Sequence, residues 1–370
     1  MKKIVNGHKV KEVLDNLAPK KLAEDWDNVG LLVGSLDREV KKVLITLDVT
    51  DKVVDEAIEK NVDFIISHHP LIFKPLKNIT TNNAQGKLIT KLIKNDISVF
   101  TLHTNLDNAK CGVNSWLAEK LKLVNSENLT TEYVENYYKL VVYVPKTHIA
   151  LVTRALGDSG AGSIGEYSHC TFKTEGVGEF LPLENSNAYI GNKNELTTVE
   201  EVKIETLVSD KNKNKVLSAM KKAHPYEEVA YDLYKVEQNY ESFGLGKIGY
   251  LENEKTLEEF AYYVKNIFNM PFVKLIGKKD EKIKKVAVLG GSGSSFINVA
   301  RIKGADVYVT GDVTYHTALD AKEENFNIID AGHYIERVMV AELTNYLKEN
   351  ITEIEVVESV VDTHPYDIII

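Results

Sequence analysis

The sequence has only two cysteines in 370 residues, Cys111 and Cys170. Two cysteines cannot build a disulfide framework, and these two lack the spacing of a zinc finger. No apolar run approaches the length of a membrane-spanning helix, and the first residues lack the apolar core of a signal peptide. We therefore expect a reduced, cytoplasmic protein that has no membrane partner.

An excess of positive charge is also missing. The 45 lysines and arginines stand against 54 aspartates and glutamates, which gives a net charge of −9. A chain with this charge has no general affinity for the nucleic-acid backbone. The charge therefore disfavours a nucleic-acid or transcription-factor adaptor. The length of the chain suits two or three domains.

Histidines, in contrast, are concentrated at the ends of apolar β-like runs. Five of the ten histidines lie in the segments 64–70, 99–107, 307–316 and 328–337. They are His68, His69, His103, His316 and His333. In open α/β sheets, functional groups gather beyond the carboxyl ends of the strands. We therefore expect these imidazoles to converge with the nearby carboxylates Asp107 and Glu336 in a metal site.

The spacing within these segments supports a shared site. His103 and Asp107 are four residues apart, and His333 and Glu336 are three apart, so each pair would share one face of a helical turn. The nitrogen and oxygen donors suit Zn²⁺, Mn²⁺ or Fe²⁺ and do not distinguish among them. The adjacent His68 and His69 would point in opposite directions in a strand. Both can serve one ion only if the backbone turns there; otherwise each would take its own ion.

His316 is a weaker candidate than the others. A single histidine at a strand end is most often a hydrogen-bonded structural residue, because a neutral imidazole both donates and accepts. We weigh that interpretation equally with a role in the site for His316.

The chain also contains an internal duplication. Residues 41–69 align without a gap with residues 284–312, at a constant offset of 243. Both segments have the pattern of a strand, an amphipathic helix and a second strand. Residues 98–107 resemble residues 327–336, which places Asp107 on Glu336. The sequence therefore predicts two related α/β lobes whose strand ends face each other.

The region between the two duplicated segments follows a different pattern. Residues 137–235 read as two halves, each with a strand and a helix, which is typical of a ferredoxin-like domain. We predict an N-terminal α/β lobe at 1–128, an inserted α+β domain at 129–242 and a C-terminal α/β lobe at 243–370.

Three smaller signals complete the pattern. The glycine-rich stretch 286–296 follows a strand and fits a tight turn into a helix better than a phosphate loop, because it lacks the G-x-G-x-x-G spacing. The segment 223–228, A-H-P-Y-E-E, recurs in part at 363–367 and is predicted to be a proline-defined turn. Asp27 and Asp48 lie near predicted strands and are candidates for the floor of the site.

Four motifs together resemble one protein family over the whole chain. They are L-A-E-D-W-D-N-V-G-L at 22–31, I-S-H-H-P at 66–70, H-T-N-L-D at 103–107 and G-H-Y-I-E at 332–336. The chain resembles the NIF-three-like (NGG-interacting-factor-three-like) family, whose members are often named GTP cyclohydrolase type-two homologues. The resemblance implies two α/β lobes around a dinuclear metal site, a PII-like inserted domain and homohexamers.

The resemblance also implies which residues bind the metals. It assigns Glu336 as the bridging ligand and places His103 in or beside the ligand sphere. The implied ligands are His68, His69, Asp107, His333 and Glu336. The implied cofactor is a pair of divalent metal ions per chain. We expect zinc, with iron and manganese as alternatives.

Two functions are compatible with this site. The first is a metal-dependent hydrolase that attacks a purine C8 or a phosphoester of a nucleotide, with His103 moving protons and His316 as the alternative. The second is a non-catalytic metal-handling or regulatory protein. Both functions use the same ligands, so the sequence does not separate them.

Overall fold

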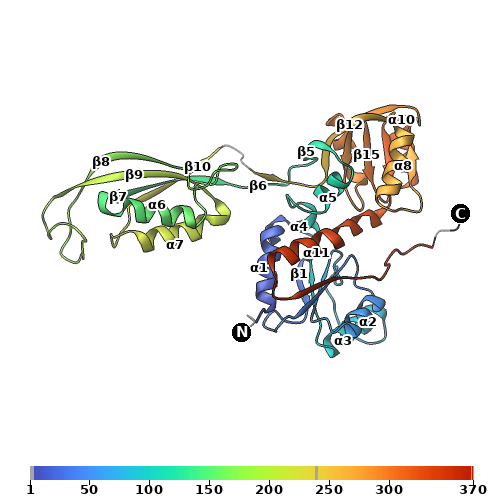
Figure 1. Cartoon of the computed structure of the whole chain (residues 1–370), viewed down its shortest axis with the longest axis horizontal. Coiled ribbons are helices and arrows are strands. Elements are labelled where there is room, and N and C mark those ends of the chain that lie inside the picture. Colours follow the sequence, from blue (N-terminus) through green and yellow to red (C-terminus); the bar gives the residue numbers. More distant parts are fainter. Residues whose placement is uncertain (1–3, 238–240, 368, 370) are drawn as a thin grey trace. The chain divides into compact units, whose positions relative to one another are not determined.

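The computed structural model describes residues 4–237, 241–367 and 369 (Figure 1). The chain divides into two compact units, which we call the core unit (residues 1–133 and 243–370) and the insert unit (residues 134–242). No helix within the described ranges combines the length and apolarity needed to cross a membrane.

The core unit contains two mixed α/β lobes. The N-lobe is built on a five-stranded sheet in the order β1-β4-β3-β2-β17. Its strands are β1 (Gly30–Val33), β2 (Lys42–Thr46), β3 (Phe64–Ser67), β4 (Ser98–Thr101) and β17 (Glu355–Glu358). Its helical segments are α1 (Gly7–Leu17), η1 (Lys20–Leu22), α2 (Asp51–Glu59), α3 (Ala84–Lys94) and α4 (Thr104–Asp107). Helix α5 (Val113–Lys120) follows α4 in the chain but packs against strands of the other lobe, β12 (Lys247–Thr256) and β14 (Lys282–Val288).

The C-lobe is built on a six-stranded sheet in the order β13-β16-β15-β14-β12-β5. Its strands are β5 (Val124–Asn128), β12 (Lys247–Thr256), β13 (Lys274–Ile276), β14 (Lys282–Val288), β15 (Val307–Thr310) and β16 (Asn327–Asp330). Its helical segments are α8 (Leu257–Ile267), η4 (Ser294–Phe296), α9 (Ile297–Ile302), α10 (Tyr315–Glu323) and η5 (His333–Arg337). Helix α11 (Val338–Asn350) follows η5 in the chain but packs on β2 and β17 of the N-lobe sheet.

The two sheets repeat one strand plan. In the N-lobe, β2, β3 and β4 are parallel and β1 pairs antiparallel with β4. In the C-lobe, β14, β15 and β16 are parallel and β13 pairs antiparallel with β16. The side chain of Asp63 accepts hydrogen bonds from the backbone N–H groups of residues 41 and 42, and Asp306 does the same for residues 284 and 285. The offset of 243 residues therefore holds down to individual hydrogen bonds.

Two strands exchange lobes relative to the predicted boundaries. β5 precedes residue 129 but pairs with β12 in the C-lobe, and β17 comes from the C-terminal segment but pairs with β2 in the N-lobe. Each lobe therefore completes its sheet with chain from the other half. The strand exchange ties the two lobes to each other.

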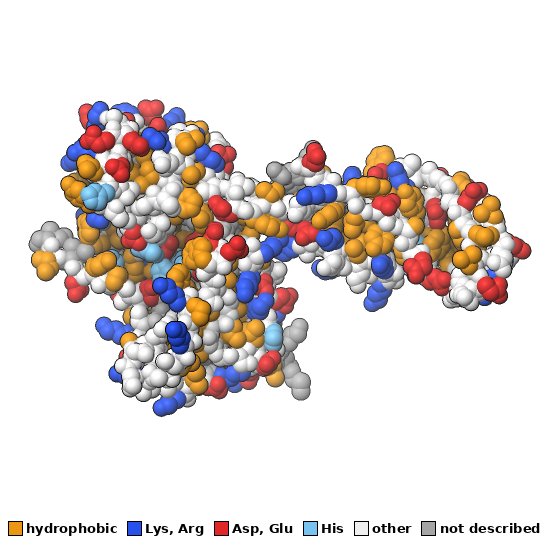
Figure 2. All heavy atoms as spheres, turned by 180° about the vertical axis from the view of Figure 1, so that it is seen from behind, with side chains coloured by type: hydrophobic (Ala, Val, Ile, Leu, Met, Phe, Trp, Pro, Cys, Tyr) orange, Lys and Arg blue, Asp and Glu red, His pale blue; other side chains and the backbone are white. Residues whose placement is uncertain are grey.

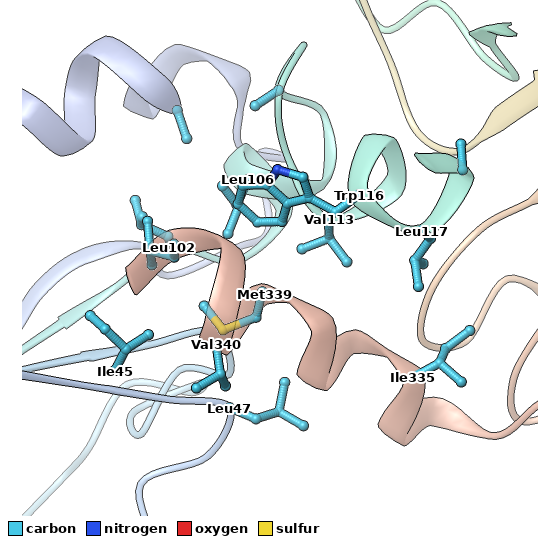
Figure 3. Close-up of a cluster of buried hydrophobic side chains, with 14 of the residues drawn as sticks. Ile45, Leu47, Leu102, Leu106, Val113, Trp116, Leu117, Ile335, Met339 and Val340 are labelled. Atoms are coloured by element: carbon cyan, nitrogen blue, oxygen red, sulfur yellow. The ribbon is translucent and has the colours of Figure 1, made fainter. Parts of the chain in front are cut away.

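A continuous hydrophobic core also joins the lobes. Figure 3 shows side chains of the N-lobe and of α11 in one cluster, with Met339 and Val340 beside Ile45 and Leu47. These four side chains are buried. Truncating a buried side chain of this kind to alanine typically lowers the free energy of unfolding by about 2–5 kcal/mol. This packing therefore stabilises the contact between the lobes and the crevice that lies between them.

The insert unit has a four-stranded antiparallel sheet in the order β10-β7-β9-β8. Its elements are β7 (Tyr137–Pro145), η2 (Lys146–His148), α6 (Ile149–Asp158), β8 (Thr171–Phe180), β9 (Thr197–Ser209), η3 (Asp210–Asn212), α7 (Lys213–Ala223) and β10 (Tyr231–Val236). The element order β-α-β-β-α-β is that of ferredoxin-like domains. The unit has its own core, to which α6 contributes Val152 and α7 contributes Val216. The likeness to PII signalling proteins stays a prediction.

We expect the insert unit to be removable. The segments that lead into and out of it, β6 (Tyr133–Val134) and β11 (Ser242–Phe243), pair as a two-stranded sheet, and the rings of Tyr133 and Phe243 lie 5.9 Å apart. Replacing residues 135–241 by a short glycine-serine linker should therefore leave a soluble core with the metal content of the full chain. Size-exclusion chromatography and elemental analysis would check this, and aggregation or loss of metal would contradict it.

Candidate metal centre

Four of the histidines singled out in the sequence lie just past the carboxyl ends of parallel strands, three in the N-lobe and one in the C-lobe. His68 and His69 follow β3, and His103 follows β4 at the start of α4. His333 begins η5, just after β16. Gly332 connects β16 to η5 with a φ of +78°, a left-handed conformation that glycine adopts without strain. The strand ends of both lobes therefore supply groups to one crevice.

The backbone bends at the two adjacent histidines. The N–H groups of both His68 and His69 donate to the carbonyl of Leu47, at 3.2 and 3.0 Å. This bend ends the alternation of the strand, so both rings reach the same crevice. The structure thus meets the condition under which two neighbouring histidines serve a single site.

Each of the four histidine rings is oriented through its Nδ1 atom. The Nδ1 atoms of His69, His103 and His333 lie 2.6, 2.9 and 2.7 Å from carboxylate oxygens, and that of His68 lies 2.8 Å from a backbone carbonyl. The partners are Asp48 for His69, Asp27 for His103, Asp312 for His333 and Leu102 for His68. Carbonyl oxygens and ionised carboxylates only accept, so Nδ1 carries the proton in each ring. This arrangement is typical of metal-binding histidines, whose other nitrogen faces the ion.

The Nε2 atoms converge with Glu336 and Asp107. The Nε2 atoms of His69 and His333 lie 3.2 Å apart, and each is 3.1 Å from Oε2 of Glu336. Nε2 of His68 lies 3.6 Å from Oδ1 of Asp107 and 3.7 Å from Oε2 of Glu336. The six residues form three overlapping groups of three ligands, and within each group the ligand atoms lie within 4.8 Å of one another. The groups are His68, His69 and His103; His69, His333 and Glu336; and His68, Asp107 and Glu336.

These facing atoms need a positive charge between them. Nε2 of His68 and Oδ1 of Asp107 are buried, and neither has a hydrogen-bond partner among the described residues. Leaving buried polar atoms unpaired costs about 1–3 kcal/mol each. Lone pairs of imidazole nitrogens and carboxylate oxygens repel one another unless a proton or a cation lies between them. The donor set and its unpaired atoms therefore fit divalent metal ions.

The pKa values show the same need for positive charge. Burial alone would lower the pKa of His69, but its hydrogen bonds to Asp48 and Glu336 raise it to about 10. Burial likewise opposes protonation of His333, yet Glu336 and Asp312 raise its pKa to about 9. Burial and the charge of Glu336 raise the pKa of Asp107 to about 8. Burial acts in the same direction on Glu336, but the surrounding histidines hold its pKa well below the usual range.

Metal binding should consequently release protons. The pKa values of His69 and His333, about 10 and 9, favour protonated rings at pH 7 in the metal-free site, and the raised pKa of Asp107 favours its acid form. Metal ligands, in contrast, must be deprotonated. We expect up to three protons to leave per chain, and the metal affinity to fall as the pH is lowered. Titration calorimetry with zinc in PIPES and in Tris, whose ionisation enthalpies differ, measures the number. A release near zero would contradict the protonation pattern.

The site opens onto a cavity of about 450 Å³ in the core unit. Its lining includes Trp26, His103, Ser292, Phe296 and Glu336. Trp26 is 60% exposed, and its ring lies 6.1 Å from the ring of His103. Figure 2 shows histidine side chains, in pale blue, beside acidic side chains between the two lobes. A small molecule in this cavity would therefore lie against the histidine cluster and an aromatic face.

The glycine-rich loop after β14 forms one wall of the site. A Cβ atom at Gly291, which has a φ of +62°, would lie 2.5 Å from Oε1 of Glu336. The N–H groups of Gly290 and Gly293 donate to side chains of Asn114 and Thr310, so they are already used. The loop is glycine-rich because Glu336 packs against it, in line with the tight turn predicted from the sequence.

Sequence reasoning and structure differ at two residues. His316 is exposed on α10 with its ring against Tyr315, and it belongs to none of the ligand groups found among the described residues. Asp312, the partner of His333, was not predicted as a site residue. The duplication could have indicated it, because Asp312 aligns with His69.

The fold and the cluster together define a two-lobed α/β protein with a candidate metal centre of four histidines and two carboxylates. The chain belongs to the Duf34/NIF3 (NGG1p interacting factor 3) family, whose model matches residues 5–365. The resemblance seen in the sequence motifs is thereby confirmed.

Relatives of known sequence and structure match almost the entire chain. A Bacillus subtilis protein named "GTP cyclohydrolase 1 type 2 homolog" is 47% identical over 370 residues, which cover 99% of each chain. A crystal structure of a Bacillus cereus protein related to NIF3 is 49% identical, with a TM-score of 0.94, and the match covers 99% of this chain and 100% of that one. A Staphylococcus aureus structure is 37% identical over 99% of each chain, with a TM-score of 0.77.

Proposed function

We propose that this protein binds two divalent metal ions per chain and is a metal-dependent hydrolase acting on a nucleotide. The observation that supports it most directly is the convergence of the Nε2 atoms of three histidines on two carboxylates at the wall of an open cavity. The ligands would be His68, His69, Asp107, His333 and Glu336, with Glu336 between the ions. When bound, such a pair of ions supplies Lewis acidity for hydrolysis.

The donors alone do not single out one metal. Imidazole and carboxylate suit zinc, iron and manganese, and we favour zinc because it needs no redox partner and accepts varied geometry. The nucleotide class is supported by the name of the Bacillus subtilis relative and by Trp26, whose exposed ring offers a stacking surface for a base.

His103 is the residue that we propose moves protons. Its Nδ1–H is held by Asp27, and Asp27 also accepts hydrogen bonds from the N–H and hydroxyl groups of Thr104. These contacts hold the imidazole in one orientation and one tautomer. His103 lines the cavity, so its Nε2 is available to a bound substrate. His316, the alternative named from the sequence, lies outside the ligand groups, and we do not propose it for this role.

The oligomeric state and the alternative, non-catalytic function can each be tested. A homohexamer is the assembly that the family resemblance implies, and light scattering of the purified chain would measure it. A non-catalytic metal-handling protein would use the same ligands without needing the cavity or Trp26, so the open cavity favours a hydrolase.

The decisive functional experiment is an activity screen of defined metal forms. Metal-free protein is loaded separately with zinc, manganese and ferrous iron, and each form is incubated with GTP, GDP, GMP and ATP, followed by chromatography of the products. Metal-dependent conversion of a nucleotide, absent in His69→Ala loaded in the same way, is the expected result. If no metal form converts any nucleotide, the metal-handling function replaces the hydrolase.

A further inference from the structure

The insert unit contains a cavity of its own, with a volume of about 540 Å³. Its walls come from the loop between β8 and β9 and from the turn before β10. That turn carries the H-P-Y-E motif: Nδ1 of His224 accepts a hydrogen bond from the N–H of Tyr226, and Nε2 of His224 lies 2.9 Å from the carbonyl of Tyr143. The motif is thus a hydrogen-bonded turn, and it places Tyr226 in the wall of the cavity.

Three aromatic rings form one part of the lining. The ring of Tyr226 lies 6.1 Å from that of Phe180 and 6.3 Å from that of Tyr189, at interplanar angles of 57° and 46°. Two histidine rings contact this group edge-on: His224 contacts the central ring, that of Tyr226, at a centroid distance of 4.9 Å, and His148 contacts Tyr189 at 5.6 Å. The three rings are tilted against one another and do not stack, and all three residues line the cavity.

Acidic side chains form the other part, and basic ones are missing from it. Among the lining residues that the structure describes, four are glutamates and none is lysine or arginine. The glutamates are Glu179, Glu201, Glu227 and Glu228. Oε1 of Glu201 accepts the hydroxyl of Tyr226 at 2.9 Å, and Glu227 accepts the N–H of Asn187, which ties the loop to the turn. An anionic ligand such as a nucleotide would meet only negative charge here, because none of the candidate metal-ligand residues lies among the described lining residues of this cavity.

We propose that this cavity binds a small organic cation with an apolar body, of the quaternary-ammonium class. The faces of Tyr189, Tyr226 and Phe180 would attract the cationic head through cation–π interactions. Glu201 and Glu228 add opposite charge. A bare divalent metal ion fits less well, because hard cations take oxygen ligands whereas Leu181, Pro182 and Ile190 supply apolar wall. The proposal stands independently of the metal centre in the core unit.

Choline is the probe that tests the charge requirement. Saturation-transfer NMR on the full-length protein would follow the choline methyl protons during a titration, in parallel with 3,3-dimethylbutan-1-ol, its neutral isostere. We expect saturable binding of choline and at least about tenfold weaker binding of the isostere. Equal binding of both, or no binding of choline, would overturn the proposal.

Matched variants locate the site. Tyr189→Leu removes a ring that is 52% exposed, and Glu228→Gln removes an exposed charge, so both variants should fold. We expect Tyr189→Leu to weaken choline binding about tenfold and Glu228→Gln to weaken it severalfold, with metal content unchanged. The control is Glu200→Gln, whose side chain pairs with Lys146 outside the cavity. Choline binding equal to wild type in both test variants would contradict the assignment.

Discussion

Replacing Glu336 by alanine should remove at least one of the two metal ions that we propose for each chain. Oε2 of Glu336 lies 3.1 Å from the Nε2 atoms of both His69 and His333, and His68 lies 3.7 Å away. The carboxylate of Glu336 therefore lies close to histidines of both lobes. Its loss would also leave the facing imidazoles without their shared negative partner. Plasma mass spectrometry of the purified variant measures the metal content directly.

The control for this variant is Glu349→Ala, which removes an exposed carboxylate from the last turn of α11. It should keep the wild-type metal content. If Glu336→Ala is folded by circular dichroism and binds as much metal as the wild type, Glu336 is not a bridging ligand.

His103→Gln should lower the turnover of a nucleotide substrate by roughly 10²–10⁴-fold, the usual cost of losing a general acid–base group. Glutamine keeps the size and polarity of the side chain but cannot carry a proton. Because our ligand set does not include His103, the variant should retain both metals. Single-turnover rates and metal analysis of the same preparation separate the two effects.

The two alternative results have different meanings. Loss of metal in His103→Gln would make His103 a ligand, which its position within 4.8 Å of His68 and His69 ligand atoms allows. Full activity with full metal would remove His103 from the mechanism. Asp27→Asn, which weakens the support of the ring at Nδ1, should lower activity less than His103→Gln does.

Much of the core unit could be predicted from the sequence because its pattern is local. Apolar strands that end in histidines are visible as continuous runs. The ungapped duplication shows which strands of the two lobes correspond to each other. Asp63 and Asp306 are equivalent positions of the two duplicated segments, and each accepts hydrogen bonds from two backbone N–H groups. The same residue type thus has the same structural role in both lobes. The element order of the insert likewise follows from its alternating strands and helices.

The remaining features depend on contacts between segments far apart in the chain. Nothing in β5 or β17 indicates that each pairs in the sheet of the other lobe, because strand pairing is decided by the completed sheet edge. His316 ends an apolar, strand-like segment of the sequence, but strand β15 stops at Thr310, and His316 lies six residues later on α10 with its side chain exposed. The aromatic cavity of the insert unit joins residues 180, 189 and 226, which have no common spacing.

Anomalous diffraction from crystals of the zinc-loaded full chain is the most direct test of the metal centre. Data collected on both sides of the zinc edge locate each ion without reference to activity or to mutation. Our account predicts two peaks per chain in the crevice between the lobes, in contact with Nε2 of His68, His69 and His333 and with the carboxylates of Asp107 and Glu336. A single peak, or peaks only elsewhere on the chain, would contradict it.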